Sequence, residues 1–189
     1  MDQRPVSPVD LKIIQDWSVV MTMVETIIAK SKTHYTEIRP YGNATFYDLG
    51  NYGSVIHHHI SENWFMVHSK LLEKHLTWLP KMLADMAELS PTWLISVLDS
   101  NAAEHTDFSH YPTALNYPIN TTNAMTYVKY LNSEYTYPSI ADQPWLLSTK
   151  FPHGVRNTEH RLVFNMHFGA EYDAVKSWLD QHPNLVYGN

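Results

Sequence analysis

The chain has 189 residues, of which 44% are hydrophobic and 13% aromatic, and its formal net charge is −6 at pH 7. This composition supports a packed core in one domain and excludes global disorder. The 13 lysine and arginine residues are spread thinly, which argues against nucleic acid or an anionic membrane as a partner. Cysteine is absent, so disulfides, thiolate metal sites and a cysteine nucleophile are excluded.

The start of the sequence shows neither a secretion signal nor a membrane span. Asp2 and Arg4 lie beside two early prolines, and the most apolar N-terminal stretch, residues 13–29, contains Asp16 and Glu25. Charges within such a stretch are costly in a bilayer. We therefore expect a cytoplasmic protein, and the oligomeric state stays open.

Residues 1–90 have the pattern of a mainly helical region. Apolar side chains recur at helical spacing in residues 8–32 and again in residues 61–75, and a third helical segment, 81–89, follows Pro80. Four aromatic side chains of this half and the next segment are expected in the core rather than in a substrate site: Trp64, Phe65, Trp78 and Trp93.

Between these expected helices, residues 35–59 form an aromatic segment interrupted by glycines and Pro40. This pattern indicates a loop with one short strand near residues 45–47. We expect the loop to fold over a site as a lid. The histidine run at residues 57–59 is interpreted as a surface feature.

After Pro91 the pattern changes to short strands separated by turn residues. Six strands within about 75 residues, with no helix between them, indicate an antiparallel sandwich or small barrel. A final helix is expected at residues 171–181. The six candidate strands are residues 93–98, 104–108, 114–119, 125–130, 145–148 and 161–168.

The whole chain is therefore expected to form a single α+β domain, residues 1–189. Residues 1–90 would supply a helical buttress and a possible lid. Residues 91–168 would form the β core, and residues 169–189 a C-terminal helix and tail.

His105 and Asp107 are the first candidates for a metal site. Residues i and i+2 of a strand point to the same face, so this imidazole and this carboxylate would project together. His153 follows 46 residues after Asp107, between Pro152 and Gly154, in a tight turn that can aim a side chain. Two histidines and one carboxylate leave coordination positions open, as in the facial triad of non-haem iron(II) oxygenases.

Arg161 opens the strand 161–168, whose strict alternation places Arg161, Val163, Asn165 and His167 on one face. A guanidinium on a central strand needs an anionic partner, because burying it unpaired is expensive. A dicarboxylate held in the arginine fork would be such a partner.

Four sequence strings now carry a resemblance: H-T-D at 105–107, A-L-N-Y-P-I at 114–119, P-W-L-L-S-T-K-F-P-H-G-V at 144–155 and R-L-V-F-N-M-H-F at 161–168. Together they resemble the 2-oxoglutarate/Fe(II)-dependent dioxygenases, most closely the small stand-alone members from phage and bacteria. The resemblance covers roughly residues 93–168. It implies a double-stranded β-helix (a jelly-roll, cupin-like fold) with Fe(II) between two facing sheets.

The resemblance also implies roles for individual residues. His105, Asp107 and His153 match the iron ligands. Arg161, eight residues after His153, matches the residue that pairs with the distal carboxylate of 2-oxoglutarate. A second set is implied less directly: Asn116 as a polar neighbour of the co-substrate, and Tyr127 or Tyr130 as a hydroxyl donor to one of its carboxylates. The sequence departs from the family at Val163, where many members carry serine.

Simpler interpretations exist for each residue. His105 and Asp107 could form a hydrogen-bonded pair without metal, and His153 could be an exposed turn residue. Arg161 could pair with Asp142 or Glu159. His167 could point into the barrel, although a structural hydrogen bond is the first expectation for it. The correct order and strand context of the whole set favour the metal site.

The resemblance implies a hydroxylase that uses Fe(II), 2-oxoglutarate and dioxygen and releases succinate and CO2. Retention of Asp107 favours C–H oxidation over halogenation, which in related enzymes needs the carboxylate removed. The prime substrate stays open among a peptide side chain, a free amino acid and a small metabolite. Two alternatives are a cupin-like metal protein or dioxygenase that does not use 2-oxoglutarate, and a degenerate scaffold. The intact triad argues against the scaffold.

Overall fold

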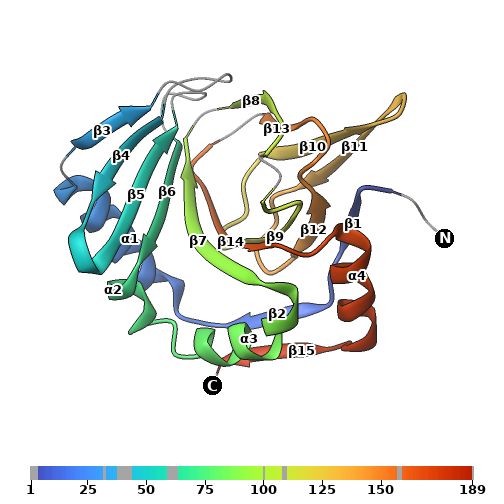
Figure 1. Ribbon diagram of the computed structural model, residues 1–189, viewed down its shortest axis with the longest axis horizontal. Helices are drawn as coiled ribbons and strands as arrows, with labels where there is room; N and C mark the ends of the chain where they lie inside the picture. Colours follow the sequence, from blue (N-terminus) through green and yellow to red (C-terminus); the bar gives the residue numbers. More distant parts are fainter. Residues whose placement is uncertain are drawn as a thin grey trace.

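Two antiparallel sheets face each other in the computed structural model of the protein, with the helices outside them (Figure 1). Strands β8, β13, β10 and β11 lie across the centre of the molecule from β14, β9 and β12. The structure describes residues 4–31, 33–37, 44–58, 64–99, 101–107, 110–156 and 159–188.

The major sheet contains nine strands in the order β1-β12-β9-β14-β7-β6-β5-β4-β3. Every neighbouring pair in it is antiparallel. In that order, the strands span Val6–Pro8, Trp145–Ser148, Thr113–Pro118, Arg161–Phe168, Pro91–Leu98, Trp64–Ser69, Gly53–His58, Ala44–Asp48 and Thr33–Glu37.

The minor sheet contains four antiparallel strands in the order β11-β10-β13-β8. They span Ser133–Pro138, Met125–Tyr130, His153–Arg156 and Ala102–His105. A third, parallel pair joins β2 (Leu11–Ile14) to β15 (Leu185–Gly188) near the two ends of the chain. The fold class is α+β, as expected, with two facing sheets at its centre.

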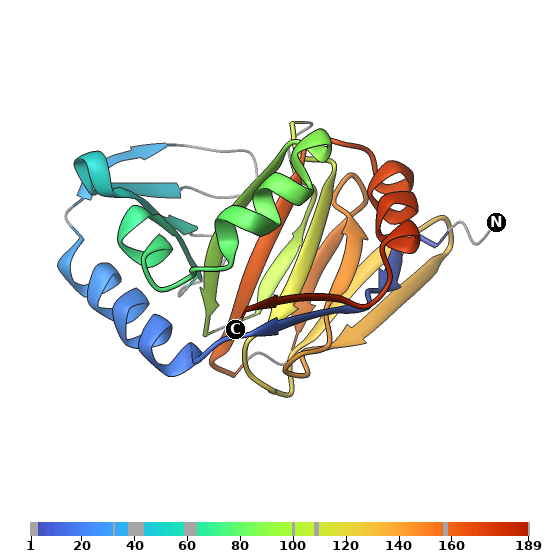
Figure 2. The same ribbon diagram turned by 90° about the horizontal axis from the view of Figure 1, so that it is seen from below.

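The helices and the β2–β15 pair lie along the outer face of the major sheet (Figure 2). The helices are α1 (Trp17–Lys30), α2 (Lys70–Glu73), α3 (Leu79–Asp85) and α4 (Tyr172–Gln181), with 3-10 turns η1 (Gly50–Tyr52) and η2 (Ala87–Leu89). Among the described residues, no helix is both long and apolar enough to cross a membrane.

Helix α1 shows why this layer packs where it does. Asp16 caps its N-terminus, because the carboxylate accepts a hydrogen bond from the backbone N–H of Ser18 at 3.0 Å. Val20, Val24 and Ile27 lie on one face and are buried. This face belongs to the main hydrophobic core between the helices and the major sheet.

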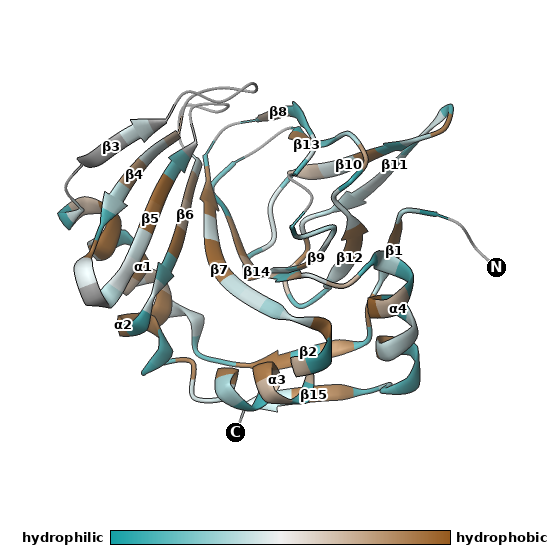
Figure 3. Ribbon diagram, in the orientation of Figure 1, coloured by the Kyte–Doolittle hydropathy of each residue, from teal (hydrophilic) through white to brown (hydrophobic). Residues whose placement is uncertain are grey.

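Strands β5, β6 and β7 pack one face against the helical layer and turn the other face toward the space between the sheets. Hydrophobic residues recur along all three strands (Figure 3). Val67, paired with Ile95, points toward the helical layer and is fully buried. Their neighbours Met66 on β6 and Ser96 on β7 also pair with each other. Because successive side chains of a strand point to opposite faces, Met66 and Ser96 line a cavity between the sheets.

The expectation that residues 1–90 are mainly helical is wrong. The predicted helix 8–32 begins only at Trp17, because β2 alternates buried and exposed residues and pairs with β15. The predicted helix 61–75 contains strand β6, which ends where Ser69 caps the one-turn helix α2. Pairing with β5 and β7 makes this segment a strand, although its apolar residues also have helical spacing.

The predicted lid at residues 35–59 also needs correction. Its described part contains β4 and β5, which extend the major sheet, while residues 38–43 and 59 lie outside the described residues. The short strand expected at 45–47 lies within β4.

The second half follows the expectation closely. Strands β10, β12 and β14 have the predicted bounds, and β7 and β9 differ from theirs by one or two residues at an end. Helix α4 begins one residue later than expected. Three strands were missed, β11, β13 and β15, and the strand expected at 104–108 is β8, which ends at His105.

Candidate metal centre

His105 and His153 face each other on neighbouring strands of the minor sheet. His105 ends β8, His153 begins β13, and the two residues are paired in the β-ladder. Their imidazole rings lie 4.4 Å apart between centroids. Asp107 follows β8, and its backbone N–H donates to the carbonyl of Thr149 at 3.1 Å. The sheet therefore fixes the backbone of all three predicted ligands.

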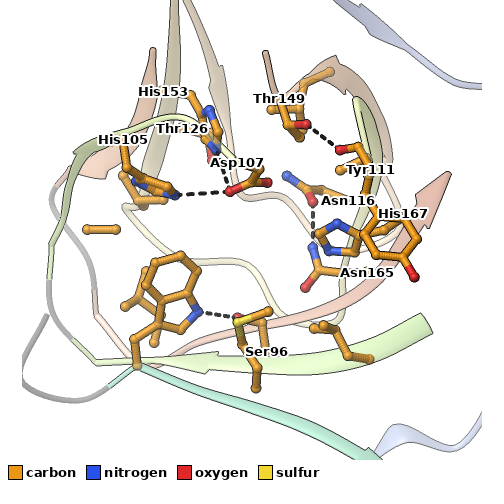
Figure 4. Close-up of a pocket in the computed structure, with 18 of the residues that line it drawn as sticks. Ser96, His105, Asp107, Tyr111, Asn116, Thr126, Thr149, His153, Asn165 and His167 are labelled. Carbon is orange, nitrogen blue, oxygen red and sulfur yellow. Dashed lines mark hydrogen bonds and ion pairs between the residues drawn. The ribbon is translucent and has the colours of Figure 1, made fainter. Parts of the chain in front are cut away.

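The three side chains converge on one point (Figure 4). Asp107 Oδ1 lies 3.8 Å from His105 Nε2 and 3.9 Å from His153 Nε2. One ligand atom from each residue lies within 4.8 Å of the others. Metal–ligand bonds of about 2.0–2.2 Å hold neighbouring ligand atoms roughly 3–3.6 Å apart, so small side-chain movements would close this set on an ion. The same distances are too long for the hydrogen-bonded His105–Asp107 pair of the simpler interpretation.

Both histidines are held in the tautomer that metal binding needs. His105 Nδ1 lies 2.8 Å from the carbonyl of Ala103, and His153 Nδ1 lies 2.9 Å from the carbonyl of Phe151. A ring N–H donated to a carbonyl leaves Nε2 with a free lone pair. Burial lowers the pKa of His153, and the charge of Asp107 only partly opposes this effect. His153 is therefore favoured in the neutral form that binds metal.

Arg161 is a buried cation without a carboxylate partner in the described part of the chain. Only 5% of the residue is exposed. One guanidinium nitrogen, Nη2, lies 3.2 Å from Thr126 Oγ1, and Nε has no hydrogen-bond partner. Burial lowers the pKa of Arg161, although a guanidinium stays charged in proteins. The site therefore contains a positive charge that lacks a counter-ion.

The two carboxylates considered as partners for Arg161 interact elsewhere. Asp142 accepts a hydrogen bond from the hydroxyl of Tyr117 at 2.8 Å. Glu159 accepts one from the amide of Asn123 at 3.1 Å. The purely structural interpretation of Arg161 therefore has no support in these contacts.

Asn116 belongs to a buried polar chain beside Arg161. Its Nδ2 donates to the hydroxyl of Tyr137 at 3.0 Å, and its Oδ1 accepts from Asn165. Tyr137 is almost fully buried, and burial raises the pKa of its hydroxyl. Asn165 Oδ1 is buried without a partner among the described residues. Like Arg161 Nε, it is an orphaned polar atom beside a cavity, as expected where a ligand completes the site.

The two tyrosines predicted as hydroxyl donors lie elsewhere. Tyr127 points away from the cavity, and its ring lies 3.9 Å from the guanidinium carbon of Arg156. Tyr130 packs edge-on against Phe151 at 4.7 Å. Strand alternation explains the error, because Thr126 faces the cavity and its neighbour Tyr127 therefore cannot.

Two tyrosines that the sequence analysis missed do reach this region: Tyr111 lines the cavity, and Tyr137 contacts Asn116. Tyr137 lies on β11, directly opposite Thr126 in the ladder with β10. A usable signal was present, because residues 133–138 follow strand 125–130 after a two-residue turn and are rich in tyrosine and threonine. A hairpin prediction would have placed Tyr137 opposite Thr126.

The triad, Arg161 and Asn116 line one cavity of about 420 Å³ between the two sheets, within the range of about 300–1,000 Å³ typical of small-molecule sites. His167 also lines it and has no hydrogen-bond partner among the described residues, so the structural hydrogen bond expected for it is not found. Of the aromatic cluster expected in the core, Trp78 and Trp93 are buried there, whereas Trp64 lines the cavity.

Among the comparisons with known proteins, the one with solved structures shows the fold. No protein-family model matches the sequence, and no curated protein matches it. A prolyl hydroxylase from Trichoplax adhaerens, solved with a peptide of the hypoxia inducible factor oxygen degradation domain, superposes with a TM-score of 0.60 at 8% identity, over 88% of this chain and 84% of that one.

Two further solved structures are similar. A Pseudomonas putida prolyl-4-hydroxylase has a TM-score of 0.48 at 10% identity, over 88% of this chain and 92% of that one. An oxidoreductase of the 2OG-Fe(II) oxygenase family from Burkholderia pseudomallei has a TM-score of 0.44 at 12% identity, over 78% and 77%. The Burkholderia structure is described as a member of the 2OG-Fe(II) oxygenase family, which is the family that the sequence resembles.

The chain therefore has the double-stranded β-helix fold seen in the Trichoplax prolyl hydroxylase, and the expected fold class is confirmed. Its central cavity carries a candidate metal centre. The donor set of two imidazole nitrogens and one carboxylate, with no thiolate, fits a divalent metal such as iron(II). The orphaned cation beside it fits an anionic ligand.

Proposed function

We propose that this protein is a non-haem iron(II), 2-oxoglutarate-dependent oxygenase that hydroxylates a C–H bond of its substrate. One observation carries the proposal: a triad with free Nε2 lone pairs shares a cavity with a buried arginine that has no carboxylate partner among the described residues. A metal-binding triad alone is compatible with many metalloproteins. The unpaired arginine adds the requirement for an anion in the same cavity.

In this proposal His105, Asp107 and His153 hold Fe(II), which supplies the binding and activation of dioxygen. Three protein ligands leave coordination positions for a bidentate co-substrate and for dioxygen. The backbone carbonyls of Ala103 and Phe151 keep the two imidazoles oriented, as outer partners of metal-bound histidines commonly do.

Arg161 would bind the distal carboxylate of 2-oxoglutarate. The anion would neutralise the buried guanidinium and satisfy its free donors. Thr126 contacts this guanidinium, so it can supply the hydroxyl that Val163 lacks at the position where many family members carry serine. Asn116 would stay a neighbour of the co-substrate, held in place by Tyr137.

The overall reaction consumes 2-oxoglutarate and dioxygen and yields succinate and CO2. One oxygen atom enters succinate and the other enters the C–H bond of the substrate as a hydroxyl group. The residues of the cavity would position the reactants and exclude bulk water. Peptides and small molecules with an accessible C–H bond are the substrate classes considered.

The main alternative is a cupin-like metal protein or dioxygenase that does not use 2-oxoglutarate. It would use the same three ligands but would leave the buried guanidinium of Arg161 without an anionic partner among the described residues. Because an uncompensated buried charge costs several kcal/mol, roughly 3–5 when a buried ion pair is broken, we favour the function that supplies the anion.

The test is consumption of 2-oxoglutarate in the presence of Fe(II) and oxygen, measured as succinate formed. We expect slow, iron-dependent turnover even without prime substrate, and its loss in Arg161→Met. If the protein binds one equivalent of iron but neither binds nor consumes 2-oxoglutarate, the cupin-like alternative is correct.

A further inference from the structure

We propose that the group of the prime substrate that enters the cavity is uncharged and largely apolar, so that a free amino acid is a poor substrate. The inference rests on the proposed function and narrows the substrate classes left open by it. It follows from the side chains that line the cavity opposite the triad and from the charges around it.

The wall opposite the triad comes from β7 and from β5 and β6, which extend the major sheet beyond it. Ile56 on β5 pairs with Met66 on β6, which pairs with Ser96 on β7. All three line the cavity, as does Trp64, which points to the same face two residues before Met66. Ser96 lies across the cavity from His105 and Asp107 (Figure 4). A group approaching the metal therefore contacts this wall.

The wall is fixed in place beside the metal centre. Trp64 Nε1 donates to Ser96 Oγ at 2.8 Å, so the one polar atom of the indole is used, and the Ser96 hydroxyl keeps its proton as a neutral donor. The Trp64 ring lies 5.4 Å from the His105 ring between centroids. What remains available to a substrate from Trp64 and Met66 is apolar surface, which binds apolar groups by their removal from water.

Among the described residues that line the cavity, only Asp107 and Arg161 carry a permanent charge. Both are used by the iron and the co-substrate in the proposed function. Two ion pairs of the minor sheet keep their charges paired with each other: Lys129 with Glu104, and Arg156 with Glu134. None of them lines the cavity.

With Fe(II) and 2-oxoglutarate bound, the formal charges of the site cancel. A charged substrate group would enter without a counter-ion and would lose its hydration, which is expensive in a water-poor site. A free amino acid carries an ammonium and a carboxylate at once, and the lining offers neither a second cation nor a second carboxylate. The same amino acid within a peptide carries neither charge.

Neutral hydrogen-bonding groups are available, however. His167 lines the cavity without a hydrogen-bond partner among the described residues, and Thr92 lines it from the neighbouring strand β7. Such groups suit an amide or hydroxyl of the substrate. The cavity therefore matches an apolar group attached to neutral polar atoms, which describes a residue within a peptide better than a free metabolite acid.

The test compares matched probes that share one hydrocarbon skeleton and differ in charge. The anaerobic enzyme with Fe(II) and 2-oxoglutarate is titrated with N-acetyl-leucine N-methylamide, N-acetyl-leucine and leucine, and with the corresponding phenylalanine and proline sets. Binding is measured by perturbation of the visible spectrum of the iron complex. We expect the neutral member of at least one set to bind at least about tenfold more tightly than its charged relatives.

Tighter or equal binding of the zwitterion in every set, or no neutral member that binds more tightly, overturns the inference. This failure is distinct from failure of the proposed function. If the iron and 2-oxoglutarate spectrum forms and the probes contradict the charge preference, only the inference falls. If that spectrum never forms, the proposed function itself falls.

A charge placed on the wall gives a second, independent test. Met66 is only partly buried, so Met66→Lys is expected to fold. The affinity for the neutral leucine probe should fall at least about tenfold relative to the affinity for N-acetyl-leucine, because the new lysine supplies a cation for the carboxylate of N-acetyl-leucine. Leu131→Lys adds the same charge at a turn where the side chain is 84% exposed, and it should leave the preference unchanged. Equal effects of the two variants would contradict a role for the wall.

Discussion

The two sides of the cavity differ in chemistry and in origin. One side carries the triad, Arg161 and the Asn116 chain, and it is built by strands of the facing sheets at the centre of the fold. The other side is largely apolar and depends on β5 and β6, which extend the major sheet. In the proposed function, the strands at the centre of the fold bind the metal and the co-substrate, and β5 and β6 help to select the substrate.

The two sides also differ in how well their polar groups are satisfied. Arg161 Nε and Asn165 Oδ1 are buried without partners, at a cost of about 1–3 kcal/mol for each such group. On the apolar side, the indole N–H of Trp64 is satisfied by Ser96 Oγ. Unsatisfied groups that persist in a folded site are typical of function, where stability is given up for binding. The following predictions separate the two sides.

The largest effect is expected from His153→Ala. Loss of one of three ligands should weaken Fe(II) binding by at least about 100-fold, since even outer partners of metal ligands contribute 10–100-fold. Competition with a chelator measures the affinity. His75→Ala, which removes an exposed histidine, should bind iron normally. Normal iron binding by the His153 variant would place the metal elsewhere.

Arg161→Met should separate metal binding from co-substrate binding. We expect iron affinity to be kept and 2-oxoglutarate affinity to fall by roughly 100-fold, because charge-assisted hydrogen bonds to the carboxylate contribute about 1.5–3 kcal/mol each. Calorimetric titration in the presence of iron measures this change.

The same Arg161 variant should not destabilise the protein without ligand, because it removes a desolvated, unpaired cation. Thermal unfolding should show an unchanged or higher Tm. Arg156→Met, which breaks an exposed pair with Glu134, serves as the control for loss of an arginine. A large fall in Tm for Arg161→Met alone would indicate a structural role.

A smaller effect is expected from pH on the ligand-free protein. Burial lowers the pKa of both His153 and His167 below the ordinary value of 6.5. The unfolded chain therefore binds more protons than the folded chain between the lowered pKa values and 6.5, and stability falls as pH decreases through this window. Denaturant unfolding at several pH values measures the slope.

Replacing His167 by glutamine should reduce this slope, because the variant removes one of the two groups. Iron should steepen the loss of stability at low pH in the wild type, since protons compete with the metal for His153. A slope that is the same in the His167→Gln variant would show that this residue does not contribute.

The smallest effect concerns the apolar side. Trp64→Phe removes the hydrogen bond to Ser96 and should cost about 0.5–1.5 kcal/mol of unfolding free energy in addition to lost packing. Adding Ser96→Ala should cost less in the Trp64→Phe background than in the wild type, as measured by a double-mutant cycle. Strict additivity would mean that the two side chains do not interact. Iron binding should be normal in all three variants.

The sequence allowed the catalytic half of the fold to be predicted because its strands alternate clearly. In β14, alternation placed Arg161, Asn165 and His167 on the cavity face, and the structure has all three lining the cavity. The H-x-D spacing and the later histidine supplied the triad, and pairing of β8 with β13 brings His105 and His153 together. These signals are local, so a single sequence contains them.

The first half could not be predicted in the same way because its short strands imitate a helical pattern. Leu11 and Ile14 have helical spacing, yet Leu11 is buried and Ile14 is 45% exposed, since burial in β2 alternates. Likewise, choosing between Tyr127 and Tyr137 depends on which residues of β10 face the cavity. The face on which each residue of β10 lies is set by the register of its pairing with β11 and β13, and this register belongs to the tertiary structure.

The central claim is that one cavity binds iron through the triad and 2-oxoglutarate through Arg161. The most direct measurement is the visible absorption spectrum of the ligand-free protein, recorded without oxygen while Fe(II) and then 2-oxoglutarate are added. The account predicts a charge-transfer band that needs both additions, is absent in His153→Ala and requires far more 2-oxoglutarate in Arg161→Met. One equivalent of bound iron with no such band at any 2-oxoglutarate concentration would contradict it.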